Sequence, residues 1–301
     1  IEIGQVGIGQ KQLIDFMIVA LLSDGHVLVE GVPGIAKTLT SKLMAKTLGI
    51  GFSRIQFTPD LMPSDVVGTS VFNMKSGEFE YKKGPIFSNV ILIDEINRAP
   101  AKTQAALFEV MEEYQVTVDG QTHPMSLPFM VLATQNPVDQ EGTYRLPEAQ
   151  LDRFIFKAVV DYPSTEDEVV LLNNVNSNKK HDDVKNINEV ISAAEIAEFR
   201  DIVIKVHVEE KLITYIAQIE AETRENPSLY LGASPRASIA LLKASKALAV
   251  INGRDFVTPE DIKFLSKPVL RHRVILTPER EMEGKTTDEI IEMFVNKIEV
   301  P

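Results

Sequence analysis

Short apolar runs alternate with stretches of helical periodicity along the first half of the chain. The apolar runs cover residues 26–30, 51–57, 90–93, 128–134 and 154–160. Between them, residues 37–48 and 101–113 carry apolar side chains at helical spacing. Apolar runs of this length, separated by helices, are typical of a parallel sheet with helices on both faces. The first half of the chain therefore predicts an α/β domain.

Helical periodicity dominates from Thr165 onward, where the strand pattern fades. The predicted helices cover residues 165–174, 192–206, 209–223, 234–251 and 258–272. Two of them begin with a capping residue followed by proline, at Ser234 and Thr258. The polar residues 173–188 are typical of an exposed linker. We therefore expect an α/β domain over residues 1–162, a linker over 163–190 and a smaller all-helical domain over 191–301.

Composition and charge restrict the classes of protein that this chain can be. Of its 301 residues, 44% are hydrophobic and 25% are charged, which is ordinary for a globular protein with a sizeable core. The absence of cysteine excludes disulfides and thiolate metal sites. A net charge of −12 argues against binding to nucleic acid or to an anionic membrane.

The sequence also bears on location. No apolar run approaches the roughly 20 residues that a membrane-spanning helix needs, and the start of the chain lacks the basic segment of a secretory signal. We therefore expect a cytoplasmic protein, and a reducing compartment fits a chain without cysteine. Because the first residue is Ile1 and not methionine, we expect further residues upstream.

A glycine-containing loop connects the predicted strand at 26–30 to the predicted helix at 37–48. A strand, such a loop and a helix that begins with Lys-Thr form the pattern of a phosphate-binding P-loop. Backbone N–H groups and the helix N-terminus would bind the phosphates of a nucleotide, Lys37 would reach the β- and γ-phosphates, and the Thr38 hydroxyl would bind Mg²⁺. The residues expected at the nucleotide are Gly31, Val32, Pro33, Gly34, Ile35, Ala36, Lys37, Thr38 and Leu39.

Ala36 departs from the usual pattern, which has glycine directly before the lysine. A methyl group is tolerated at that position if the backbone φ is negative. The alternative interpretation of the whole segment is an ordinary Gly-Pro turn between a strand and a helix.

Two adjacent acids follow the predicted strand at 90–93. Asp94 and Glu95 would lie at the carboxyl end of a buried strand, which is where open α/β sheets bind ligands. Asp94 would hold Mg²⁺, directly or through water, and Glu95 would orient and polarise the attacking water. Alone, two such acids indicate only an exposed strand end. Together with the P-loop they predict a nucleotide-hydrolysing site.

Six segments together resemble the MoxR family of AAA+ ATPases. They are the loop at 31–38, with alanine at position 36 as in that family, and residues 56–68, 94–100, 133–137, 146–154 and 232–237. The resemblance extends over nearly the whole chain, from about residue 6 to residue 274. It implies an AAA+ fold, in which a P-loop NTPase core with a parallel sheet is followed by a helical lid domain.

The resemblance also implies roles for residues outside the loop. Asn136 matches the sensor-1 residue, which binds the γ-phosphate or the attacking water. Arg153 matches the arginine finger, which reaches the nucleotide of the neighbouring subunit, and Arg236 matches the sensor-2 arginine, which contacts the nucleotide of its own subunit. Placed positive charge stabilises a phosphoryl-transfer transition state, whereas an isolated arginine is more often a surface salt-bridge partner. Arg98 and Arg145 could also face an adjacent subunit.

Two β-hairpins are expected as well. Their strand pairs are 69–72 with 78–82 and 115–118 with 121–123. In related AAA+ proteins such hairpins face the centre of the ring and touch the client; the alternative is a pair of surface hairpins without a partner. The segment before the first helix, which contains Gly9 and Gln10, resembles the family segment that packs near the adenine base.

The resemblance implies an ATP-driven, Mg²⁺-dependent hexameric ring that acts as a chaperone on a protein client. Such proteins mature enzyme complexes or insert cofactors and metals, often with a partner that carries a von Willebrand factor A domain. One alternative is a DNA-dependent motor or loader, which the net charge of −12 disfavours. Another is a slow nucleotide-gated switch, which the joint presence of Glu95, Asn136, Arg153 and Arg236 disfavours. The sequence does not name the client, the cofactor or the number of subunits.

Overall fold

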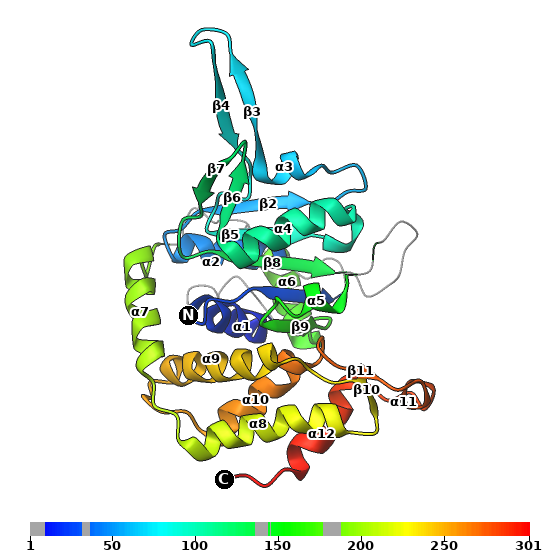
Figure 1. Ribbon diagram of the computed structural model, residues 1–301. Helices are drawn as coiled ribbons and strands as arrows, with labels where there is room; N and C mark the ends of the chain where they lie inside the picture. The colour runs from blue at the N-terminus through cyan, green and yellow to red at the C-terminus, as the bar shows by residue number, and fades with distance from the viewer. Residues whose placement is uncertain (1–9, 32–36, 136–143, 145, 177–187) are drawn as a thin grey trace. The chain divides into compact units, whose positions relative to one another are not determined.

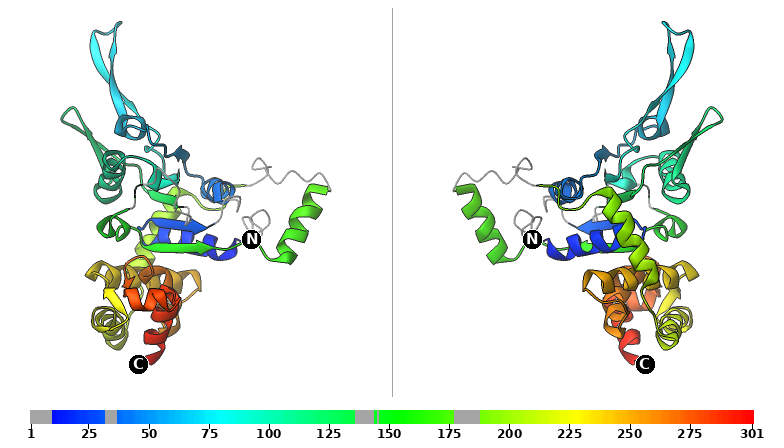
Figure 2. Two further views of the ribbon diagram at one scale, coloured as in Figure 1. Left: turned by 90° about the vertical axis from the view of Figure 1, so that its right-hand side faces the viewer. Right: turned by 90° about the vertical axis from the view of Figure 1, so that its left-hand side faces the viewer.

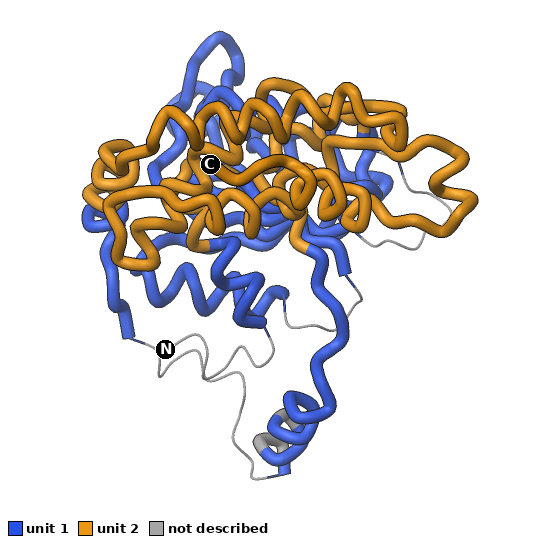
Figure 3. The backbone as a smooth tube through the Cα atoms, turned by 90° about the horizontal axis from the view of Figure 1, so that it is seen from below, with its two compact units in different colours: residues 1–17, 26–146, 159–196 blue, residues 18–25, 147–158, 197–301 orange. Residues whose placement is uncertain are grey.

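The computed structural model describes residues 10–31, 37–135, 144, 146–176 and 188–301. By their internal contacts the residues divide into two compact units, shown in blue and orange in Figure 3. Unit 1 comprises residues 1–17, 26–146 and 159–196, and unit 2 comprises residues 18–25, 147–158 and 197–301.

Five strands form the parallel sheet that the apolar runs predict. They are β1 (Val27–Gly31), β2 (Phe52–Gln56), β5 (Val90–Asp94), β8 (Met130–Gln135) and β9 (Phe156–Val160). Their order is β2-β5-β8-β1-β9, and the registers of β2 with β5, β5 with β8 and β8 with β1 are all parallel. β5 lies between two neighbours, and its residues 90–93 are fully buried. The expected α/β fold class is therefore confirmed.

Helices lie on both sides of this sheet in unit 1. α2 (Lys37–Thr47) packs against β2 and β5 and buries Leu43 and Met44. α4 (Ala101–Glu113) lies on the opposite side in Figure 2 and buries Leu107 and Phe108. The other helical elements that begin in unit 1 and precede the C-terminal helices are α1 (Lys11–Leu22), α3 (Pro63–Val67), the 3₁₀ turn η2 (Ile96–Arg98) and α6 (Thr165–Asn176). α6 confirms the helix expected over residues 165–174, and it lies within the span expected as a linker.

Two antiparallel hairpins extend from unit 1, and both confirm the sequence prediction. β3 (Gly68–Asn73) pairs with β4 (Glu78–Lys83), and β6 (Gln115–Val118) pairs with β7 (Gln121–Pro124). Asp119 and Gly120 between β6 and β7 have φ values of 51° and 75°, the left-handed pair that a two-residue hairpin turn requires. Figure 1 shows the β3–β4 hairpin as the longer of the two.

The two hairpins are joined to each other by side chains. The Ser70 hydroxyl of β3 donates a hydrogen bond to the carboxylate of Asp119 in the other turn. The rings of Tyr81 in β4 and His123 in β7 are stacked, with their centroids 4.3 Å apart. We call these four residues the hairpin junction.

Unit 2 is built mainly from helices, as expected for the second half of the chain. They are α5 (Glu148–Leu151), most of α7 (Ala193–Lys205), α8 (Glu210–Glu225), α9 (Pro235–Ile251), α10 (Pro259–Leu270), α11 (Pro278–Met282) and α12 (Thr287–Lys297). α9 packs against α8 and α10, and α12 packs against the same two helices. A short antiparallel pair, β10 (Leu229–Leu231) with β11 (Ile275–Leu276), was not expected, because two or three residues are too few to show a period of two.

Both predicted helix starts are confirmed in unit 2. Ser234 is the N-cap of α9 and accepts a hydrogen bond from the amide of Arg236, and Thr258 begins α10 with a capping box to Asp261. In the part of the chain that the structure describes, none of the helices combines the length and the apolar composition needed to cross a bilayer.

Candidate active site

The expected phosphate loop lies between β1 and α2. β1 ends at Gly31, and α2 begins at Lys37, with Thr38 and Leu39 in its first turn. The flanking strand and helix therefore lie where the P-loop pattern requires them. Several other predicted site residues lie outside the described residues: Gly9, Val32, Pro33, Gly34, Ile35, Ala36, Asn136 and Arg145.

Lys37 lies across the start of this loop. Its Nζ donates a hydrogen bond to the backbone oxygen of Gly31, at 2.9 Å. Burial lowers the pKa of Lys37 from its ordinary value, although the carboxylates of Asp94 and Glu30 oppose that shift. A partly buried ammonium group between a strand end and two acids is suited to a polyphosphate, because added anionic oxygens would offset its lost hydration.

Asp94 is the last residue of β5, at the carboxyl end of the sheet. Its Oδ2 accepts from Arg54 Nε of the neighbouring strand β2 at 2.6 Å, and its Oδ1 accepts from the Thr134 hydroxyl of β8 at 3.4 Å. The Asp94 side chain is 15% exposed, whereas that of Arg54 is 53% exposed. Both partners come from strands next to β5, so the sheet order places them here.

Glu95 follows Asp94 in a left-handed backbone conformation, with φ 56° and ψ 53°. Its amide donates to the Thr134 hydroxyl at 3.0 Å, and its Oε2 accepts from Gln56 Nε2 and from Arg98 Nε, each at 3.1 Å. A non-glycine residue in this region costs on the order of 1 kcal/mol, and such strain is concentrated at functional sites. The strand end thus directs two carboxylates to the same edge of the sheet.

The donor set fits Mg²⁺ with nucleotide phosphates. Thr38 and Asp94 offer the hydroxyl and carboxylate oxygens that Mg²⁺ prefers, and this ion is usually bound by one or two protein groups plus phosphates and water. Among the described residues, no group of three or more His, Asp or Glu side chains could enclose a metal ion.

Gln10 is the described member of the segment expected near the base. It is buried, and its side-chain Oε1 finds no hydrogen-bond partner among the described residues. A buried amide oxygen is an acceptor of the kind that an adenine amino group needs.

Arg153 and Arg236 both belong to unit 2. Arg153 follows the short helix α5, and its amide donates to the Gln150 oxygen at 3.2 Å. Arg236 is exposed in the first turn of α9, where its amide donates to the Ser234 hydroxyl at 3.2 Å. The structure therefore places both predicted arginines in unit 2, Arg153 just after the end of α5 and Arg236 at the start of α9.

The sequence analysis missed the residues that fix the backbone around Arg153. The buried guanidinium of Arg273 donates to Asp152 Oδ1 at 2.6 Å and to the backbone oxygen of Phe154 at 2.7 Å. His272 Nε2 lies 2.9 Å from the same Phe154 oxygen, and burial lowers the pKa of His272 well below its usual value, so this ring is a neutral donor. The signal in the sequence was two arginines flanking a histidine at 271–273, at the predicted end of the helix over 258–272.

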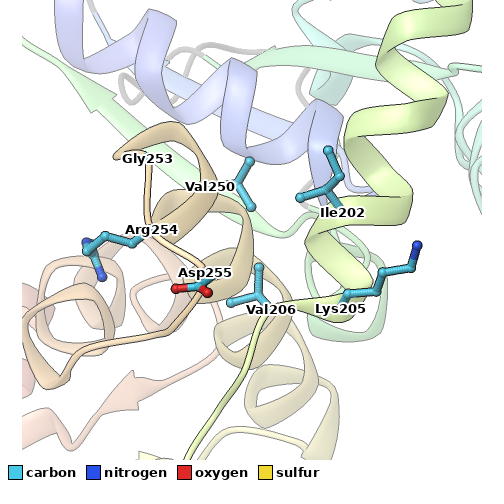
Figure 4. Close-up of a pocket in the computed structure, with 7 residues that line it drawn as sticks. All are labelled: Ile202, Lys205, Val206, Val250, Gly253, Arg254 and Asp255. Atoms are coloured by element: carbon cyan, nitrogen blue, oxygen red, sulfur yellow. The ribbon is translucent and has the colours of Figure 1, made fainter.

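Unit 2 also contains an open cavity of about 380 Å³ at the end of α7 and α9. Figure 4 shows apolar side chains of Ile202, Val206 and Val250 around it, whereas Lys205 and Arg254 point away. Arg254 is instead paired with both carboxylate oxygens of Asp261, at 2.6 and 2.8 Å. This cavity contains none of the predicted site residues.

Comparisons with known proteins agree with this geometry. Residues 26–156 match the family described as "ATPase family associated with various cellular activities (AAA)", and residues 221–293 match the AAA lid domain. The Bacillus subtilis protein YeaC is 46% identical over 300 residues, covering 100% of this chain and 93% of that protein. A solved structure from Cytophaga hutchinsonii is 45% identical, covers 100% of this chain and 93% of that one, and superposes with a TM-score of 0.91.

A second relative carries a functional name. Chaperone MoxR1 of Mycobacterium tuberculosis is 41% identical over 309 residues, which cover 100% of this chain and 81% of that protein. The likeness spans the strands, the acids at the sheet edge and the helical unit described above. The chain belongs to the MoxR family of AAA+ ATPases.

Proposed function

We propose that this chain binds ATP with Mg²⁺, hydrolyses it as an oligomeric ring and remodels a protein client. The observation that carries the proposal is the position of Asp94 at the carboxyl end of β5, within electrostatic reach of Lys37 at the start of α2, with Glu95 directly after it. Ligands of open parallel sheets bind at this edge.

Each predicted site residue of unit 1 has a proposed role in nucleotide binding or in proton transfer. The loop backbone at 31–36 and Lys37 bind the phosphates, and Thr38 with Asp94 holds the metal ion, which when bound neutralises phosphate charge. Glu95 orients the attacking water and accepts its proton. Gln56 and Arg98 both bind Oε2 of Glu95, so they orient this carboxylate. Asn136 is proposed as the second group that positions the water.

Arg153 is proposed to act on the nucleotide of the neighbouring subunit, whereas Arg236 is proposed to contact that of its own. A finger acting between subunits makes each active site composite, and such arginines contribute about 10³–10⁵ to the rate in other phosphoryl-transfer enzymes. Specific ATPase activity should therefore rise with protein concentration as rings form. Arg153→Ala should be slow at every concentration.

Mixing two inactive variants tests the composite site. Lys37→Ala loses phosphate binding, and Arg153→Ala loses the finger, but an interface between an intact Lys37 site and an intact Arg153 should recover turnover. The matched control mixes Lys37→Ala with Glu95→Gln, because both defects lie in a subunit's own site and no interface is then complete. Inactivity of the first mixture, with mixed rings shown by native mass spectrometry, would contradict the role of Arg153 and make Arg145 the next residue to test.

The β3–β4 hairpin is proposed as a contact for the client. Its tip exposes three large apolar side chains, Phe72, Met74 and Phe79, and Met74 is 92% exposed. Exposed apolar groups gathered in this way often mark an interaction surface. The hairpin junction connects them to the second hairpin.

A chaperone assay tests this contact. We expect the protein to suppress the aggregation of chemically denatured citrate synthase, and we expect replacement of Phe72, Met74 and Phe79 by serine to abolish suppression with ATPase activity retained. Met282→Ser is the control, because Met282 is also strongly exposed, at 81%, and belongs to α11 in unit 2 instead of the hairpin. Equal suppression by the triple variant and the wild type would exclude the hairpin tip as the contact. The cytoplasmic location, the role in cofactor or metal insertion and the von Willebrand factor A partner stay predictions.

A further inference from the structure

One carboxylate in unit 2 connects the segment of Arg153 to the helix that carries Arg236. Asp152 directly precedes Arg153, and its Oδ2 accepts a hydrogen bond from the Ser234 hydroxyl at 2.6 Å. Ser234 is the N-cap of α9, and Arg236 lies two residues further on. The other oxygen of Asp152, Oδ1, accepts from Arg273 Nε at 2.6 Å. The two arginine-bearing segments therefore share one partner.

Arg273 makes the Asp152 side of this connection rigid. Its side chain is 2% exposed, and besides Asp152 Oδ1 it donates to the backbone oxygens of Asp152, Phe154 and Ile155, at 3.1, 2.7 and 3.2 Å. These oxygens lie on both sides of Arg153. A buried guanidinium that lost such acceptors would be left desolvated and unpaired, which is costly. The backbone around Arg153 therefore moves together with Arg273 and Asp152.

The Ser234 side of the connection is equally constrained. Thr223 Oγ1 of α8 accepts from the Ala233 amide at 3.1 Å, and Arg224 Nε donates to the Ala233 oxygen at 3.1 Å. A Cβ atom at Gly232 would lie only 2.6 Å from the backbone oxygen of Thr223, so the chain at Gly232 lies directly against α8. Because α9 begins one residue after Ser234, its first turn cannot rotate without disturbing the bond to Asp152.

We propose that Asp152, with Ser234 and Arg273, couples neighbouring active sites of the ring. This inference rests on the proposed roles of Arg153 and Arg236. A change at the start of α9, where Arg236 contacts the nucleotide of its own subunit, moves Asp152 and with it the finger presented to the next subunit. Asp152, Ser234 and Arg273 are positioning residues, because they act through the two arginines and touch no nucleotide.

The test uses Ser234→Gly, which removes the bond to Asp152 while leaving a residue that is tolerated as an N-cap at a cost of a few tenths of a kcal/mol. Asp152→Asn is less suited, because it alters the partner of a buried guanidinium and could unfold the unit. Ser234→Thr keeps the hydroxyl and is the conservative rescue. Thr286→Gly is the matched control, because it removes the N-cap hydroxyl of α12 outside this network.

The substitutions are placed in the Glu95→Gln subunit, which is expected to retain nucleotide binding, and this subunit is mixed with Arg153→Ala subunits. The Glu95→Gln subunit has no turnover of its own and contributes only its finger, so any loss must act through Arg153. A displacement of about 1 Å can cost on the order of 10²-fold in rate. We therefore expect Ser234→Gly to lower the recovered turnover by roughly 10- to 100-fold, with Ser234→Thr and Thr286→Gly close to the unmodified mixture.

Hydrogen exchange gives a readout that does not depend on turnover. The amides of residues 152–157 should exchange faster in Ser234→Gly than in the wild type, and at the wild-type rate in Thr286→Gly. Full recovery of turnover in the mixture whose finger-contributing subunit carries Ser234→Gly would overturn the coupling but not the role of Arg153. An unchanged exchange rate of the amides of residues 152–157 would do the same. An unmodified mixture that stays inactive in demonstrated mixed rings would overturn the finger and the coupling together.

Discussion

Two Arg–Asp ion pairs with the same N–O distance differ strongly in solvent exposure in this protein. The Arg54–Asp94 pair in unit 1 and the Arg273–Asp152 pair in unit 2 both measure 2.6 Å. The Arg54 side chain is 53% exposed, whereas that of Arg273 is 2% exposed and binds several backbone oxygens as well. The distance between two charges therefore does not tell how firmly they are held.

This difference in burial between the two pairs agrees with the function proposed for each region. Exposed pairs contribute about 0–1 kcal/mol, so Asp94 can exchange Arg54 for a metal ion or water at little cost. Breaking a buried pair by removing one partner costs about 3–5 kcal/mol. The edge of the sheet thus holds groups that must change partners during turnover, and unit 2 holds groups that must keep them.

The largest expected effect separates turnover from stability. Glu95→Gln should lower the ATPase rate by about 10²–10⁴, because an amide cannot accept the proton of the attacking water. Nucleotide binding, measured by calorimetry, should be retained, and the free energy of unfolding should change by less than about 1 kcal/mol. A variant that hydrolyses ATP at the wild-type rate would show that Glu95 is not the base.

The second prediction concerns the buried pair. Arg273→Ala should lower the free energy of unfolding by about 3–5 kcal/mol, measured by urea denaturation, because the Asp152 carboxylate and four backbone oxygens lose this donor. Arg54→Ala is the natural comparison, since it removes an arginine from a pair of the same length. Similar losses in the two variants would refute the contrast between the regions.

The third prediction uses pH. Burial raises the pKa of Glu220 from 4.5 to about 6, against the opposing effect of Arg224. The folded protein therefore keeps this proton up to about pH 6, while the unfolded chain loses it near 4.5, so folding loses stability as pH rises between these values. The loss amounts to roughly 2 kcal/mol. Thermal unfolding should show it in the wild type and in Glu225→Gln, an exposed control on the same helix, but not in Glu220→Gln.

The smallest expected effect belongs to the exposed pair itself. Arg54→Ala should change the free energy of unfolding by about 1 kcal/mol or less, and less still at high salt, because the pair is screened by solvent. Urea denaturation at low and high ionic strength measures both. A large loss that persists in salt would mean that Arg54 supports the sheet rather than the acids.

Local patterns predicted much of the fold. The apolar runs located the strands, Asp119–Gly120 located a hairpin turn, and Ser234 located the start of α9, because each of these depends on residues close in sequence. The acids at the end of β5 followed from the rule that parallel sheets bind ligands at their carboxyl edge.

The partners of the site residues could not be predicted in the same way. Arg54 and Gln56 reach Asp94 and Glu95 only because β2 lies next to β5, and the sequence analysis did not establish that order. Arg273 binds Asp152 across 121 positions of the chain. The family resemblance assigned a role to Arg153 but said nothing of the side chains that hold its backbone.

The hairpin junction has a mechanical consequence. Because Ser70 is bonded to Asp119 and Tyr81 is stacked on His123, a pull on the tip of the long hairpin is shared with the shorter one. The shorter hairpin leads through residues 125–129 into β8, whose Thr134 hydroxyl is bonded to the amide of Glu95. Force applied at Met74 therefore has a continuous route, through covalent bonds and side-chain contacts within unit 1, to the backbone of the residue proposed to activate water.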